Sequence, residues 1–163
     1  MLTIAVAAAL AGTSSAADAS YEIVGYGGTS GGIAASIQAA RVGKSVVMIE
    51  PTKFLGGLTT GGLGATDIGN KQAIGGISCE FYQRIIKHYS DPTNWRQQKR
   101  DEYFAKKPHG NSDTEDTMWT FEPHVATQVF DDMLRETKVQ VVLGERLDLK
   151  NVLKKRAGAS RKL

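Results

Sequence analysis

The residues best suited to chemistry form a glycine-rich run between two apolar segments. Six consecutive small residues make up this run: Gly27, Gly28, Thr29, Ser30, Gly31 and Gly32. Glycine lets the backbone approach a phosphate closely, and a helix that begins there aims free N–H groups and its positive dipole end at the anion. The run therefore predicts a binding site for the pyrophosphate of a dinucleotide. A glycine-rich turn without any nucleotide is the alternative.

An acidic residue stands at the distance that such a site requires. Glu50 lies 18 residues after Gly32, at the end of the second apolar segment. A carboxylate at this place accepts hydrogen bonds from a ribose hydroxyl and disfavours a 2′-phosphate, so an NADP-type site is not expected. The strict pattern G-x-G-x-x-G would place a glycine where Thr29 stands. Because the Cβ of Thr29 occupies space near the phosphate, we expect the geometry of the site or its affinity for the dinucleotide to differ from that of the strict pattern.

The segments around this run predict a strand–helix–strand unit. Residues 22–26 and 45–50 are short apolar runs typical of buried strands. Residues 31–42 are typical of a helix, and Gly43 suits its C-terminal cap. A unit of this length is typical of a right-handed parallel crossover. We therefore predict an α/β fold, a Rossmann-like domain built on a parallel sheet.

The remainder of the chain predicts further helices and one more strand. Residues 77–90 repeat apolar side chains at near-helical spacing, and 123–136 begin with a proline that favours a first helical turn. Residues 139–143 predict a third strand, and 144–149 are a candidate returning segment beside it. The polar residues 91–117 are expected to form an exposed excursion.

Four segments together resemble a known family. They read IVGYGGTSGGIAASIQAARVGKSVVMIEP with FLGGLTTGGLGATDIGN, then AIGGISCEFYQRI, then WTFEPHVATQVFDDML. These segments resemble the FAD-dependent oxidoreductases that include bacterial secreted flavoproteins, some of them labelled "xanthan lyase". The family is more distantly similar to the flavoprotein subunit of heterodisulfide reductase. The resemblance covers about residues 21–150.

The resemblance implies FAD as the cofactor and assigns roles to further residues. The FAD pyrophosphate would lie on Gly27–Gly32 and the adenosine ribose on Glu50. A second glycine block would pass the pyrophosphate and the flavin: Gly56, Gly57, Leu58, Thr59 and Thr60. Leu147 is the residue expected nearest the adenine. A purely structural loop is the alternative for the second block.

Charge and cysteine content exclude several other classes. Residues 150–163 hold six basic side chains, and without them the chain has 14 basic and 17 acidic residues. A nucleic-acid surface would be basic across a folded face, so nucleic acid is not an expected partner. The single cysteine, Cys79, excludes an intramolecular disulfide, a zinc site of several thiolates and a four-cysteine iron–sulfur cluster. No metal is predicted.

The two ends of the chain carry separate predictions. Residues 1–17 have the apolar core and small-residue cleavage site of a signal peptide, which predicts export to the periplasm or beyond; an Ala-rich helical extension of a cytoplasmic protein is the alternative. The apolar run is too short to span a membrane. Residues 18–150 would be the FAD-binding domain, and 151–163 an irregular basic tail. We expect a truncated or frameshifted chain, or alternatively a natural solvated tail.

The functional prediction follows from these parts. We expect the FAD-binding N-terminal portion of an oxidoreductase, with a small-molecule substrate or electron acceptor that the sequence does not identify. A non-catalytic nucleotide-binding module and an NAD-binding domain are the alternatives. Asp67 is a weak candidate for a polar group near the flavin ring, whereas nothing in the sequence places His124 beside a flavin and a structural role is expected for it.

Overall fold

The three predicted strands form one parallel sheet. A computed structural model describes residues 20–106 and 115–147. Strands β1 (Ile23–Tyr26), β2 (Val46–Glu50) and β3 (Gln140–Leu143) lie in the order β1-β2-β3, and all neighbours run parallel. Met48 at the centre pairs with Gly25 on one side and Val141 on the other. The predicted α/β class is confirmed.

Helix α1 (Ser30–Arg41) joins β1 to β2 and packs on the sheet. Ile33 and Ile37 stand four residues apart on its inner face, and both are fully buried. Gly43 follows the helix with a φ of +86°, a left-handed conformation that favours glycine and ends the helical run. The structure therefore confirms the predicted crossover and its glycine cap.

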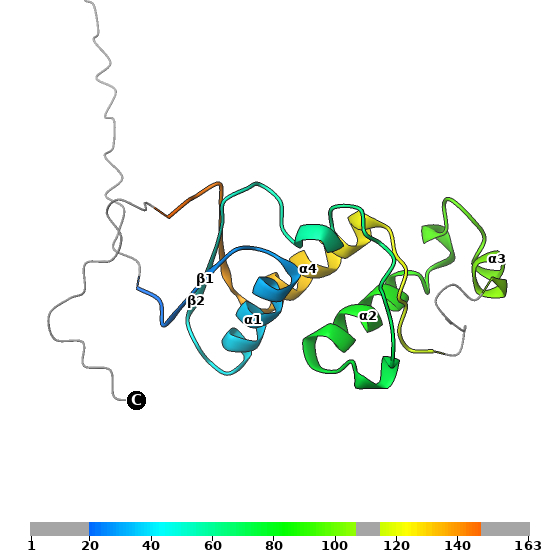
Figure 1. The fold of residues 1–163 in the computed structure, drawn as a ribbon, viewed down its shortest axis with the longest axis horizontal. Coiled ribbons are helices and arrows are strands. Elements are labelled where there is room, and N and C mark those ends of the chain that lie inside the picture. The colour runs from blue at the N-terminus through cyan, green and yellow to red at the C-terminus, as the bar shows by residue number, and fades with distance from the viewer. Residues whose placement is uncertain (1–19, 107–114, 148–163) are drawn as a thin grey trace, which may run out of the picture.

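Two longer helices complete the packed layer. Helix α2 (Gly76–His88) buries Phe81 and Ile85. Helix α4 (Pro123–Thr137) buries Val125 and Met133. Figure 1 shows α1 and α4 beside the sheet, with α2 and the short helix α3 (Arg100–Ala105) farther from it. On the edge strand β1, Val24 and Tyr26 are 59% and 49% exposed.

An ion-pair network connects the three helices at their surface. Glu80 of α2 accepts from Arg41 of α1 at 2.5 Å and from Arg84 of its own helix at 2.7 Å. Arg84 also contacts Glu136 of α4 at 2.6 Å. Because one carboxylate and one guanidinium each serve two partners, the network is expected to resist helix separation better than an isolated surface pair.

The predicted exposed excursion over 91–117 is wrong for its aromatic residues. The segment contains a 3-10 turn at Pro92–Asn94 and the short helix α3 (Arg100–Ala105). Trp95 packs between Tyr89 and Tyr103, with ring centroids 5.1 and 5.3 Å away, and Tyr103 is 7% exposed. Residues that fold into irregular turns lack a regular apolar period, so hydrophobic patterning does not reveal this small aromatic core.

Several sequence predictions fall on other parts of the chain. The predicted signal peptide at 1–17 and the basic tail at 151–163 lie outside the described residues. Residues 145–147 of the candidate returning segment form no strand, and 148–149 lie outside the described residues. Within the described part of the chain, no helix is both long enough and apolar enough to cross a membrane.

Candidate functional site

The glycine turn after β1 is held in a conformation that requires glycine at its two ends. Gly27 has a φ of +104°. A Cβ added to Gly32 would lie 2.0 Å from the carbonyl oxygen of Gly27, far inside van der Waals contact. A Cβ on Gly31 would meet nothing nearer than 3.9 Å. Gly32 therefore allows α1 to start directly against the turn, while Gly31 borders open space.

Thr29 has a definite role in this turn despite its departure from the strict pattern. It is the N-cap of α1, and its Oγ1 accepts a hydrogen bond from the Gly32 N–H at 3.2 Å. A Cβ on Gly57 would stand 3.7 Å from the Thr29 Cβ, so the second glycine block runs alongside this side chain. Threonine thus begins the helix and separates the two glycine segments.

Glu50 joins the turn to the end of β2. The residue is 8% exposed, and its Oε2 accepts from the Gly28 N–H at 2.6 Å. Its Oε1 accepts from the Thr52 N–H at 2.8 Å. These hydrogen bonds hold the pKa of Glu50 below its ordinary value, and the bond from Gly28 has the largest effect, followed by those from Thr52. The group is therefore an ionised acceptor, and each oxygen has a further lone pair for a ligand hydroxyl.

The second glycine block lies directly beside the first. The Gly56 N–H donates to the Gly28 carbonyl oxygen at 2.7 Å, and Thr29 and Gly56 form an isolated parallel bridge. Gly56 and Gly57 have φ values of +93° and +56°, which favour glycine. The Thr60 hydroxyl donates to the Leu55 carbonyl oxygen and so closes the loop. The two blocks are predicted separately from the sequence; their hydrogen-bonded contact is a finding of the structure.

A cleft of about 550 Å³ opens between these segments, and we call it the glycine cleft. Its size is within the usual range for small-molecule sites. The lining comes from the two glycine blocks, the chain after β2, α4 and β3. Its residues are Gly28, Thr29, Glu50, Thr52, Lys53, Phe54, Leu55, Gly57, Thr60, Gly61, Thr127, Asp131 and Leu143. Lys53 is the one basic side chain in this described lining.

The remaining predicted residues lie around the cleft or away from it. Gly27, Ser30, Gly31, Gly32 and Gly56 belong to the two backbone segments that border the lining. Leu58 is 72% exposed and stands with Thr59 in a 3-10 turn beside it. Leu147 is 47% exposed beyond β3, where Leu143 lines the cleft instead. The weak candidates Asp67 and His124 are exposed and do not line it.

Several lining residues were not predicted as site residues from the sequence, among them two polar residues of α4. Thr127 and Asp131 stand four residues apart on α4 and face the cleft. Their spacing places them on one side of the helix, but nothing in the pattern distinguishes them from other polar positions of an amphipathic helix. Within the described part of the chain, no three His, Cys, Asp or Glu side chains are grouped to hold a metal ion.

Comparison with known proteins identifies the family of the chain. A family model described as FAD dependent oxidoreductase matches residues 22–160, which is most of the chain. The chain therefore belongs to the FAD-dependent oxidoreductase family, whose cofactor is FAD. A search of curated proteins finds no significant match.

Solved structures provide a further comparison of fold. One similar structure is 3-ketosteroid-delta4-(5alpha)-dehydrogenase from Rhodococcus jostii RHA1 in complex with 4-androstene-3,17-dione. It shares 18% sequence identity with a TM-score of 0.40. The match covers 82% of this chain and 40% of that one, so the present chain spans less than half of its length.

Proposed function

We propose that the glycine cleft holds FAD and that the chain is the FAD-binding N-terminal portion of an oxidoreductase. One observation carries this proposal: the Gly28 N–H donates to the Glu50 carboxylate at 2.6 Å. The bond brings a phosphate-binding turn and a ribose acceptor to the same cleft, which is the arrangement that a dinucleotide requires. Family membership supports FAD as that dinucleotide.

The pyrophosphate would lie against the Gly27–Gly32 turn. The first N–H groups of α1 have no partner within the helix, and they carry its positive dipole end. The open space beside Gly31 leaves room for phosphate oxygens. Lys53 adds a positive charge to the lining. These features together fit a diphosphate without any metal ligand from the chain.

The two ends of the cofactor would lie on either side of this turn. Glu50 would accept from the adenosine ribose while it continues to hold Gly28 and Thr52. The second block would pass the flavin through Gly56, Gly57 and the exposed apolar side chain of Leu58, with Thr59 and Thr60 nearby. Adenine would lie near the end of β3, where we expect Leu147 to contact it.

Bound FAD supplies hydride or electron-pair transfer, which protein side chains do not provide by themselves. The described residues bind and orient the cofactor. Glu50 and the glycine turn fix the adenosine end, and the second glycine block is positioned to border the ring. Substrate binding and proton transfer are not assigned to any residue of this chain.

Calorimetric titration of the purified chain with FAD, FMN, ADP and NAD tests the assignment. We expect FAD to bind most tightly, ADP to compete with it, and FMN to bind at least about tenfold more weakly because it lacks the adenosine and the second phosphate. Equal affinity for FMN and FAD would overturn the placement of the adenosine end. Tighter binding of NAD than FAD would favour an NAD-binding domain. Bound flavin that no donor reduces would favour a non-catalytic module.

A further inference from the structure

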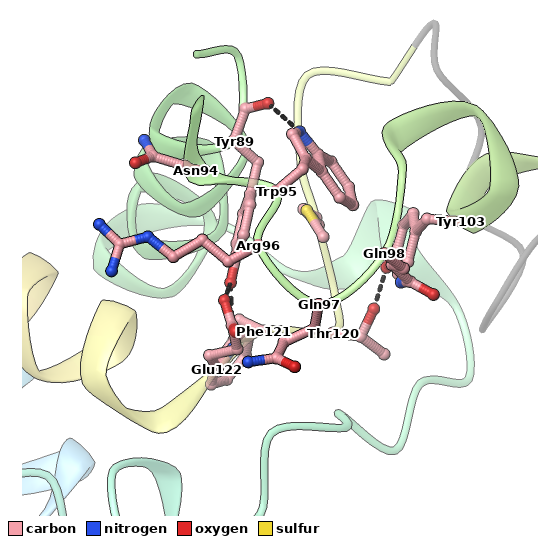
Figure 2. Close-up of a pocket in the computed structure, with 11 residues that line it drawn as sticks. Tyr89, Asn94, Trp95, Arg96, Gln97, Gln98, Tyr103, Thr120, Phe121 and Glu122 are labelled. Carbon is pink, nitrogen blue, oxygen red and sulfur yellow. Dashed lines mark hydrogen bonds between the residues drawn. The ribbon is translucent and has the colours of Figure 1, made fainter. Parts of the chain in front are cut away.

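A second pocket lies in the small aromatic core beside α3. It has a volume of about 240 Å³ and shares no lining residue with the glycine cleft. Figure 2 shows its walls, which come from the end of α2, the chain around Trp95, the start of α3 and the segment before α4. Neither the family assignment nor the proposed FAD site explains this pocket.

Aromatic side chains provide much of the apolar wall of this pocket. Tyr89, Trp95 and Tyr103 line it, with Trp95 packed between the other two rings. Met118 also lines the pocket. A cavity of about 150 Å³ is enough to bind benzene. The larger volume here therefore suits one six-membered ring with a short substituent.

One end of the pocket carries a negative charge. Glu122 lines it, half-buried, and its Oε2 accepts from the Tyr89 hydroxyl at 2.5 Å. Burial, and then the bond to Glu122, raise the pKa of Tyr89 well above its ordinary value, so the phenol stays a donor. Among the described residues, no side chain occupies the other carboxylate oxygen, Oε1. This oxygen is available to a donor from a ligand.

The other polar groups of the lining do not cancel this charge inside the pocket. Arg96 is the one basic residue in the described lining, and its guanidinium extends away from Trp95 and Tyr103 (Figure 2). Gln97 and Gln98 present neutral amides. The interior therefore combines aromatic faces with one carboxylate, and both attract an organic cation.

We propose that this pocket binds a primary amine carried on a single aromatic ring. The ring packs against Trp95 and Tyr103, and the ammonium group donates to Glu122. The site is independent of the glycine cleft, because the two have no lining residue in common.

A ¹H–¹⁵N NMR titration of the full chain, with and without added FAD, tests this site. The ligands are 2-phenylethylamine, its neutral analogue 2-phenylethanol and its anionic analogue phenylacetate. We expect the amine to shift the Trp95 indole N–H saturably and to bind at least about tenfold more tightly than either analogue. Trp119 is 2% exposed and does not line the pocket, so its indole signal is an internal reference that should not move.

Glu122→Gln and Glu102→Gln form a matched pair for the same titration. The first keeps an oxygen for the Tyr89 hydroxyl but removes the charge, and it should lower amine affinity to that of the alcohol. The second changes an exposed carboxylate of α3 outside the pocket and should have no effect. Equal binding of all three ligands, a preference for phenylacetate or an unshifted Trp95 signal would each overturn the proposal. If Glu122→Gln loses signal dispersion, the ligand comparison on the unaltered chain still decides.

Discussion

Replacing Glu50 with glutamine should weaken the fold and the cofactor site together. The carboxylate accepts two backbone N–H groups, from Gly28 at 2.6 Å and from Thr52 at 2.8 Å. In either orientation, a glutamine amide turns its NH₂ towards one of these donors. An unsatisfied buried donor costs about 1–3 kcal/mol, and the remaining bond also loses its charge assistance. We therefore expect the free energy of unfolding to fall by about 2–3 kcal/mol at neutral pH.

The pH dependence of this difference identifies the carboxylate as its source. Hydrogen bonds from Gly28 and Thr52 lower the pKa of folded Glu50 below 4.5, the ordinary value. A lowered folded pKa gives stabilisation that is fully present above the unfolded pKa and is lost as pH falls through the folded pKa. The gap between Glu50→Gln and the unaltered chain should therefore be constant near neutrality and shrink as pH drops below 4.5.

Urea denaturation followed by tryptophan fluorescence, repeated from neutral to acidic pH, measures this gap. Glu102→Gln, on the exposed surface of α3, should stay within about 0.5 kcal/mol of the unaltered chain. FAD titration should show at least about a tenfold loss of affinity for Glu50→Gln. A gap that is absent at neutral pH, or one that keeps its size throughout acidification, would refute the role assigned to the carboxylate.

Four further substitutions test the surrounding structure. Thr29→Ala removes the Oγ1 acceptor at the N-cap of α1 and should cost about 1 kcal/mol in denaturation experiments. Gly32→Ala should destabilise the turn by about 3 kcal/mol and reduce FAD binding, because its Cβ meets the Gly27 carbonyl at 2.0 Å. Gly31→Ala, whose Cβ has room in the fold, should leave stability unchanged and reduce FAD binding alone, because its Cβ would fill the space proposed for the phosphate oxygens. Arg84→Met breaks the links between α2 and α4 and should cost about 1 kcal/mol at low ionic strength, and less in high salt. A cost that does not change with salt would argue against the electrostatic account of the Arg84 pairs.

Local features of the fold were predictable because each element carries its own signal. Short apolar runs indicate β1 and β2, and the spacing of Ile33 and Ile37 indicates the buried face of α1. The distance from Gly32 to Glu50 predicts where the turn and the acid belong. Each of these signals arises within a segment of about thirty residues, in which chain geometry limits the possible arrangements.

The contacts that close the site were not predictable in the same way. The Gly56–Gly28 hydrogen bond joins residues 28 positions apart, and Gly56 itself lies in a loop with no regular period. Thr127 and Asp131 reach the cleft only because α4 packs next to α1. Trp95 was assigned to an exposed segment because its packing against Tyr89 depends on tertiary structure. Patterning reports which side of an element is buried, and it does not report which elements meet.

The parallel pairing of β2 with β3 has a consequence for the order in which the site forms. Val47 pairs with Gln140, so this pairing closes a loop of 93 residues. At ordinary rates of translation, about 5 to 20 s separate the synthesis of the two strands. The Gly28–Glu50 bond needs only the first fifty residues, whereas the cleft also needs α4 and Leu143. On the ribosome, the glycine turn can therefore form well before the cleft, and tight binding of the proposed cofactor is expected only after β3 has been synthesised.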